Sequence, residues 1–278
     1  MTKCSISFLL LALPALAAAQ PGSVFIEDRT WPEIRDAIAA GKTTAIYYAG
    51  STEQNGPHLA LGKHNFVARH VAGRIAEKLG NALVYPVMPF APTGDAAART
   101  EHMRFPGSVT VSEATFGAVA REVALSAISA GFRNVVLMGD HGGGQEELHA
   151  LASRLDAQYA PIHVRVYYCD EVYSKANGDF DVWLASHGYP ASAHGGLPDT
   201  SEMLYLGGSR GWVRKDLVAT ALGDPAVPEG KPPDPGVKLL NNGITGDGRR
   251  ANEDLGRRLF EMKVDYAVAQ IRRLMGPG

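Results

Sequence analysis

The sequence predicts an α/β fold, a three-layer α/β/α arrangement with a mainly parallel central sheet. Uncharged, β-rich segments alternate along the chain with longer segments of helical periodicity, which is the pattern of βαβ units. The chain has 278 residues, of which 45% are hydrophobic, and this is ample for a large core. Its 27 basic and 29 acidic side chains give a formal charge of -2, which is typical of a globular protein.

The first half of the mature chain is predicted to supply two strands and two helices. Thr30-Trp31-Pro32-Glu33 reads as a capping box that opens a helix, and apolar residues recur at every fourth position from Val67 to Leu79. The segments between these helices are β-rich and uncharged, as buried strands are. The predicted elements are a helix from Thr30 to Gly41, a strand over 43–49, a helix from Val67 to Gly80 and a strand over 82–88.

The second half continues the alternation and then becomes less regular. We expect helices over 112–130, 145–159, 200–206 and 252–275, and strands over 134–138 and 162–168. A Pro- and Gly-rich segment over 221–248 resembles a domain linker, but only one helix follows it. Residues 20–278 are therefore predicted to form a single domain.

The first 19 residues read as a signal peptide. A short basic start precedes an apolar run over 5–16 and three alanines, so cleavage is expected after Ala19. A membrane anchor is the alternative, but the apolar run is shorter than the roughly 20 residues that span a bilayer. We expect a periplasmic or secreted chain with no membrane attachment after signal removal. Cys169 is then the single cysteine, so no internal disulfide can form.

Two unusual polar loops leave predicted strands at the same edge of the sheet. The first covers residues 50–64 and the second covers 139–144. Ligands of open parallel α/β sheets gather beyond the carboxyl ends of the strands. The two loops are therefore expected to form one site. The absence of a Lys- and Arg-rich block argues against nucleic acid as a partner and favours a small-molecule substrate.

The first loop carries Glu53, His58 and His64, and the second carries Asp140 and His141 before three glycines. Carboxylates and imidazoles are the ligands that zinc and similar divalent metals prefer. Simple hydrogen bonding of these imidazoles within a tight loop is the alternative. A phosphate-binding loop is disfavoured because the Lys-Ser/Thr ending of a P-loop is missing.

A third stretch, from Ala193 to Glu202, places His194 before two glycines, where a core histidine gains nothing. Asp199 and Thr200 in the same stretch can act as simple helix caps or contribute to the site.

Together these segments resemble the creatininase (creatinine amidohydrolase) family of metal-dependent hydrolases. Glu53 to His64 matches the frame of the family's Glu-x-His-Gly-Pro-His-Leu-Pro-x-Gly-x-Asp motif. His141 matches the histidine of its Asn-Gly-His-Gly-Gly-Asn motif. The other matching segments are 102–107, 194–201 and 243–256. The resemblance covers nearly the whole mature chain and implies a creatininase-like fold.

The resemblance implies a centre of two divalent metals, but two ligand positions differ in this chain. Asn55 stands at the place of a histidine, and His64 at the place of an aspartate that bridges the metals. A carboxylate can span two cations, whereas a neutral imidazole offers one lone pair. We therefore predict one divalent ion per chain, held by Glu53, His64 and His141 and, if its shorter side chain reaches, Asp199. Zinc is expected, with manganese or iron as alternatives.

The resemblance also suggests roles for the remaining polar residues. His194 is the candidate proton carrier, and Asn55 and His102 are expected to position substrate. Asp140, which replaces an asparagine, is expected to orient His141 or to recover some of the lost negative charge. The predicted reaction is hydrolysis of a small amide, cyclic amide or other non-peptide C–N bond by a metal-activated water.

Creatinine itself is not the expected substrate. Ala193 replaces the glutamate of the creatininase acid/base pair, and Gly142 replaces an aromatic residue that holds creatinine. A non-catalytic binding protein derived from the family and a lactone hydrolase are the alternative functions. The resemblance further suggests a homo-oligomer, with a hexamer as one candidate.

Overall fold

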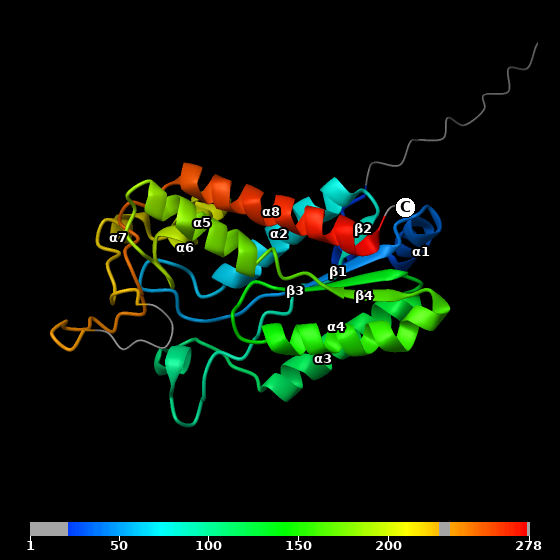
Figure 1. Ribbon diagram of the computed structural model, residues 1–278, viewed down its shortest axis with the longest axis horizontal. Coiled ribbons are helices and arrows are strands. Elements are labelled where there is room, and N and C mark those ends of the chain that lie inside the picture. Colours follow the sequence, from blue (N-terminus) through cyan, green and yellow to red (C-terminus); the bar gives the residue numbers. More distant parts are fainter. Residues whose placement is uncertain (1–21, 228–233, 277–278) are drawn as a thin grey trace, which may run out of the picture.

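The computed structural model describes residues 22–227 and 234–276. A parallel sheet of four strands runs through the middle of the molecule, with helices on both sides (Figure 1). This is the predicted fold class. The predicted signal peptide, residues 1–19, lies outside the described residues. No helix within those residues is both long and apolar enough to cross a membrane.

The strand order brings the two polar loops together. The strands are β1 (Thr44–Ala49), β2 (Ala82–Val84), β3 (Asn134–Gly139) and β4 (Arg165–Tyr168), in the order β2-β1-β3-β4. All three pairings are parallel, and Ala49 at the end of β1 faces Gly139 at the end of β3. The loops that follow β1 and β3 therefore leave the sheet side by side.

The helices form the two outer layers. On one side of the sheet lie α2 (Lys63–Leu79), α6 (Leu197–Gly207) and α8 (Glu253–Met275), and α5 (Ser174–Ser186) packs on α8. The other side is covered by α3 (Glu113–Ala130) and α4 (Gln145–Tyr159), with α1 (Trp31–Ala39) at one end. The remaining elements are the short helix α7 (Lys215–Val218) and the 3-10 turns η1 (Ile26–Asp28), η2 (Glu101–Arg104) and η3 (Ala160–Ile162).

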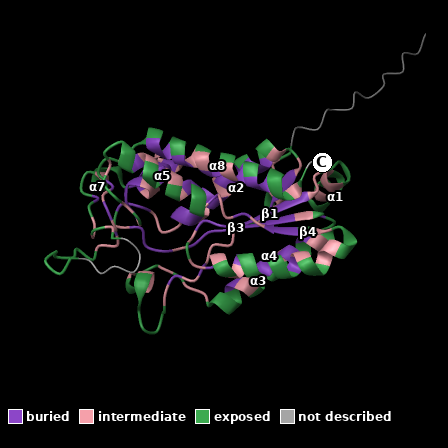
Figure 2. Ribbon diagram, in the orientation of Figure 1, coloured by how far each residue is buried: buried purple, intermediate pink, exposed green. Residues whose placement is uncertain are grey.

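Every residue of β1 is buried because alternate side chains enter the two helix layers (Figure 2). Ile46 and Tyr48 pack with α2 and α8, whereas Ala45 and Tyr47 pack with α3 and α4. This explains why the strand segments read as unbroken apolar runs in the sequence.

The structure has the predicted helix ends where capping residues mark them. The Thr30 capping box is present, Ser112 accepts a hydrogen bond from the Thr115 amide at the start of α3, and Gly80 ends α2 in the left-handed conformation. Helix α2 begins at Lys63, earlier than the apolar periodicity indicated. The strand predicted over 82–88 ends at Val84.

A glycine sets the closest approach of α6 and α8. A Cβ atom on Gly256 would lie 1.9 Å from the Ser201 carbonyl oxygen of α6. The bare backbone of Gly256 is therefore required for this packing. Helix α6 begins within the cavity wall described below, so the contact also fixes one side of the site.

We expect Gly256→Ala to lower the free energy of unfolding by about 1–3 kcal/mol, because a well-packed interface must open to accept a methyl group. Gly178→Ala is the matched control, since a Cβ on this α5 glycine would meet nothing within 4 Å. The control should be neutral or stabilising by about 0.5–1 kcal/mol. Urea unfolding followed by circular dichroism measures both. Equal stability of the two variants would contradict the close approach.

Candidate metal centre

Six segments far apart in the sequence enclose one polar cavity at the carboxyl edge of the sheet. Its volume is about 480 Å³. The wall is formed by the loops after β1 and β3, the turn η2, the loop before α6, and one face each of α5 and α8. The Asp140 amide donates to the Ala49 carbonyl at 2.9 Å and thereby ties the two strand-end loops together.

Glu53 lies at the centre of this cavity wall and is fully buried. Its Oε2 accepts hydrogen bonds from His141 Nε2 at 2.8 Å and from the Ser51 hydroxyl at 2.9 Å. Its Oε1 lies 3.1 Å from His64 Nε2. Burial opposes ionisation of Glu53, but the bonds from His141 and His64 outweigh it and hold the pKa of this carboxyl far below its ordinary value.

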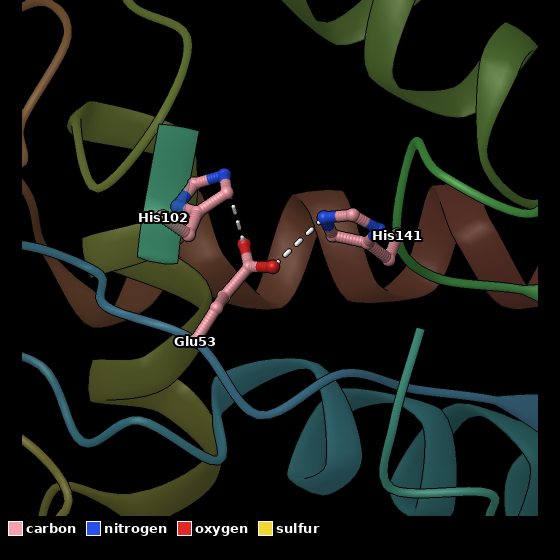
Figure 3. A group of neighbouring side chains, drawn as sticks. All are labelled: Glu53, His102 and His141. Atoms are coloured by element: carbon pink, nitrogen blue, oxygen red, sulfur yellow. Dashed lines mark ion pairs between the residues drawn. The ribbon is translucent and has the colours of Figure 1, made fainter. Parts of the chain in front are cut away.

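Two further imidazoles lie close to the same carboxylate. His102 Nε2 is 3.7 Å and His194 Nδ1 is 3.8 Å from Glu53 Oε1. Within the described residues, one group of side chains meets the geometry of a metal site: Glu53, His102 and His141, whose ligand atoms all lie within 4.8 Å of one another (Figure 3). One carboxylate and two imidazoles form a usual ligand set of catalytic zinc. The donor chemistry therefore fits a divalent ion.

His102 reaches this group from the turn η2, and the structure gives its ring a fixed orientation. The Gln54 side-chain amide donates to His102 Nδ1 at 3.1 Å, which leaves Nε2 facing Glu53. The sequence suggested substrate positioning for His102. Its distance to Glu53 also makes it a candidate metal ligand, a role that depends on the fold, and substrate positioning stays a prediction.

His64 joins two carboxylates rather than facing the cavity alone. Its Nδ1 lies 2.8 Å from Asp140 Oδ2, and its Nε2 faces Glu53. Burial and the Lys63 charge oppose protonation of His64, but the hydrogen bonds to Asp140 and Glu53 prevail and raise its pKa. The three predicted ligands Glu53, His64 and His141 thus lie together, with His64 acting as a donor to both acids.

Asp140 was expected to orient His141, and the structure assigns it other partners. Besides His64, it accepts hydrogen bonds from Tyr48 Oη and Lys263 Nζ, both at 3.3 Å. His141 is held instead by the backbone, since the Gly143 amide donates to its Nδ1 at 3.0 Å. The glycine run therefore orients the Nδ1 side of the imidazole, and Glu53 rather than Asp140 is the carboxylate that holds its Nε2 side.

A buried lysine on α8 compensates the acids behind the cavity. Lys263 Nζ donates to Glu202 Oε2 at 2.7 Å and contacts Asp140. Burial raises the pKa of Glu202 to about 7, partly offset by Lys263. Burial also opposes charging of Lys263, but Asp140 and Glu202 reverse this effect and raise its pKa. Lys263 could have been identified from the sequence, because a lysine between Leu259 and Ala267 lies on the apolar face of the closing helix.

His194 lies in the cavity wall as a neutral ring. Its Nε2 donates to the Gln54 carbonyl at 2.7 Å, so Nδ1 is left as an acceptor on the side of Glu53. Burial, assisted by the Lys63 charge, lowers the pKa of His194 to about 3. The ring is therefore a neutral acceptor at Nδ1 before substrate binds.

Two other predicted site residues have different surroundings. Asn55 is fully buried, donates to the Glu53 carbonyl at 2.8 Å and does not line the cavity. Asp199 does line the cavity, but its Oδ2 lies 2.7 Å from Lys63 Nζ and accepts from the Gly195 amide at 2.7 Å. The N-cap of α6 is Gly196, without a side-chain cap hydrogen bond, so Asp199, the third residue of the helix, is not the simple N-cap that the sequence allowed; it forms a half-buried ion pair with Lys63.

Helix α5 contributes a wall that the sequence analysis did not predict. Tyr173 precedes the helix, and Asn177 and Asp181 follow at four-residue spacing, so one face lines the cavity. Burial, with the nearby Asp199 charge, raises the pKa of Asp181 to about 6. The spacing of Ala176, Phe180 and Leu184 along the chain was the signal that could have identified this helix.

The comparison with known proteins identifies the family. A family model described as creatininase, creatinine amidohydrolase, matches residues 27–271. The chain belongs to the creatininase family. It is 28% identical over 230 residues to the mycofactocin precursor peptide peptidase of Mycolicibacterium smegmatis, covering 81% of this chain and 82% of that protein. It is 29% identical over 119 residues to creatinine amidohydrolase of Pseudomonas putida, covering 43% of this chain and 45% of that protein.

Solved structures support the fold. The crystal structure of a creatinine amidohydrolase superposes with a TM-score of 0.69 at 25% identity, covering 92% of this chain and 99% of that chain. A W-to-F variant of creatininase superposes with a TM-score of 0.71 at 24% identity and covers 92% of this chain and 100% of its own. The creatininase-like arrangement predicted from the motifs is confirmed.

His58, the remaining histidine of the first motif, has a structural role. It is fully buried, and its Nε2 lies 2.7 Å from the Thr200 hydroxyl of α6. Burial lowers the pKa of His58 to about 4, with Asp199 acting in the opposite direction. Between pH 6.5 and pH 4 the unfolded chain therefore binds a proton at His58 that the folded chain does not.

We expect the stability advantage of the wild type over His58→Gln to shrink by up to about 1.4 kcal/mol per pH unit as the pH falls from 6.5 toward 4. Glutamine cannot titrate but keeps a nitrogen donor for Thr200. His149→Gln, at an exposed position on α4, is the control for replacing a histidine by glutamine. Urea unfolding at several pH values measures the effect. An advantage of the wild type that grows on acidification would exclude a neutral buried His58.

Proposed function

We propose that this creatininase-family protein is a metal-dependent hydrolase of amide C–N bonds. The observation that carries the proposal is the meeting of Glu53, His102 and His141 on the wall of a polar cavity. Solved creatininases of similar fold are described as the Zn-Zn type and as creatininase Mn, which supports zinc or manganese as the ion. A divalent ion held by these residues supplies Lewis-acid chemistry: it makes water a stronger nucleophile and polarises a carbonyl group.

The chain's own residues supply orientation and proton transfer. Ser51 and His64 fix the two oxygens of Glu53, so this carboxylate cannot rotate away from the cavity. The Gln54 carbonyl fixes His194 with Nδ1 as an acceptor. His194 can therefore take a proton from the attacking water and return it to the departing nitrogen. Asp140 acts indirectly, by holding His64.

The substrate is proposed to be a small amide or the end of a peptide. A cavity of about 480 Å³ has the size of ordinary small-molecule sites. The family contains both a relative named a creatinine amidohydrolase and relatives named peptide peptidases. The restriction to non-peptide bonds is thus one branch of the proposal, and peptide hydrolysis is the other. Creatinine remains a disfavoured substrate because Gly142 and Ala193 bring no aromatic or acidic side chain to the cavity.

Export and self-association complete the proposal. The sequence of residues 1–19 supports a signal peptide and hence a periplasmic or secreted enzyme. Family membership supports a homo-oligomer. The substrate is proposed to be a small molecule or short peptide, with no nucleic acid or membrane partner.

Chelation should abolish hydrolysis, and added Zn²⁺ or Mn²⁺ should restore it. The assay is release of free amine from a panel of cyclic amides, linear amides and short peptides. We expect His141→Ala to lose at least about 10-fold in metal affinity because a direct ligand is removed. His149→Ala, at an exposed position on α4, is the control for histidine loss.

Full turnover by a metal-free preparation would exclude the metal-dependent mechanism. Binding of a compound at one site without its hydrolysis would favour the binding-protein alternative. Hydrolysis of lactones but not of amides would favour the lactone hydrolase.

His194→Asn should lower kcat by about 10²–10⁴-fold while metal content stays at the wild-type level, since a proton acceptor is removed and the candidate ligands remain. Elemental analysis of the same samples provides the second readout. Loss of metal together with activity would instead make His194 a ligand.

A further inference from the structure

Lys63 is a buried cation in the wall of the catalytic cavity. It is the first residue of α2, its side chain is 3% exposed, and its ammonium lies 2.7 Å from Asp199 Oδ2. Burial opposes ionisation of Asp199, but Lys63 outweighs it and lowers the pKa of this carboxyl below its ordinary value. Desolvating an ammonium and a carboxylate together is costly, so this pair requires an explanation.

While Lys63 holds its carboxylate, Asp199 is not available as a ligand of a second metal ion. One solved creatininase is described as the Zn-Zn type, so the family's fold can hold two ions. In this chain both nitrogens of His64 face carboxylate oxygens, those of Glu53 and Asp140. An imidazole whose two nitrogens both donate to carboxylates has no free lone pair, so it cannot connect two cations. Asn55 does not reach the cavity.

The charge of the cavity leads to the same conclusion. Asp199 is the carboxylate next to the candidate centre on the α6 side, and Lys63 already neutralises it. A second divalent ion near Asp199 would have to displace this ammonium or lie beside it in a buried, poorly screened position.

We propose that the Lys63 ammonium replaces a second metal ion, so that the centre holds one divalent ion per chain and Asp199 serves as the counter-charge of Lys63 rather than as a metal ligand. This inference rests on the proposed metal-dependent function and assigns the charge balance of that same site. It also gives Lys63 a positioning role that the motif comparison did not indicate.

The test is metal stoichiometry of the untagged full-length protein. Wild type, Lys63→Met, Lys63→Arg and Asp199→Asn are saturated with Zn²⁺, desalted and measured by elemental analysis, and Zn²⁺ affinity is measured by competition with a chelating dye. We expect one ion per chain for the wild type and for Lys63→Arg, which keeps the positive charge. Asp199→Asn should also bind one ion, with an affinity within about threefold of wild type. Lys63→Met leaves Asp199 uncompensated and should approach two ions per chain.

Three results would overturn the inference: two ions on the wild type, a loss of affinity of tenfold or more in Asp199→Asn, or a single ion on a folded Lys63→Met. Circular dichroism establishes folding, and if Lys63→Met does not fold, the wild-type and Asp199→Asn values decide. A wild-type chain that binds no Zn²⁺ would refute the proposed function itself. That result differs from each of the three.

Discussion

The site depends on one buried carboxylate. Glu53 is completely removed from solvent, and an ionised carboxylate in such a place is tolerated only when donors surround it. Four imidazoles and one hydroxyl surround Glu53: those of His64, His102, His141, His194 and Ser51. They come from four separate parts of the chain, which are the loop after β1 with the start of α2, the turn η2, the loop after β3 and the segment before α6. The position of Glu53 therefore links the fold to the chemistry. Any element that shifts removes a partner from this carboxylate.

Two lysines balance the acids that the sheet edge brings together. Lys263 neutralises Asp140 and Glu202 behind the cavity, and Lys63 neutralises Asp199 at its side. Both lysines and two of their three acidic partners lie on α8, α2 and α6, the helices that cover one face of the sheet, whereas Asp140 follows β3. Both lysines, Asp140 and Glu202 are buried and Asp199 is half-buried, so the loss of one member leaves a poorly solvated charge without its partner. The helix layer thus sets both the shape and the charge of the site.

The sequence predicted those parts of the fold that depend on local pattern. Uncharged β-rich runs identified β1 and β3, and the βαβ alternation predicted that their carboxyl ends lie at one edge of a parallel sheet. The site residues on the two strand-end loops were therefore placed correctly at one edge. Helix α5 was missed because its apolar positions are few, and Ser174, Asn177 and Gly178 weaken its helical signal.

Contacts between distant segments could not be predicted from the local sequence pattern. The approach of His102 to Glu53 depends on how the turn η2 folds over the cavity, which no spacing in the sequence encodes. The partners of Asp140 depend on α2 and α8, so sequence proximity suggested His141 when the closest donor is His64. Lys63 was assigned to a loop because helix α2 starts before its apolar periodicity begins.

The departures from the family motifs are connected by one contact. His64 stands where the motif has an aspartate, and Asp140 stands where another motif has an asparagine. The two side chains face each other at 2.8 Å. With an aspartate at position 64, two carboxylates would face each other at this buried contact, and with an asparagine at position 140, His64 would lose the negative charge that it faces. Together His64 and Asp140 form a satisfied pair, which accounts for both exchanges by one physical requirement. The candidate metal centre thus has a hydrogen-bonded pair in place of two residues of the family motifs.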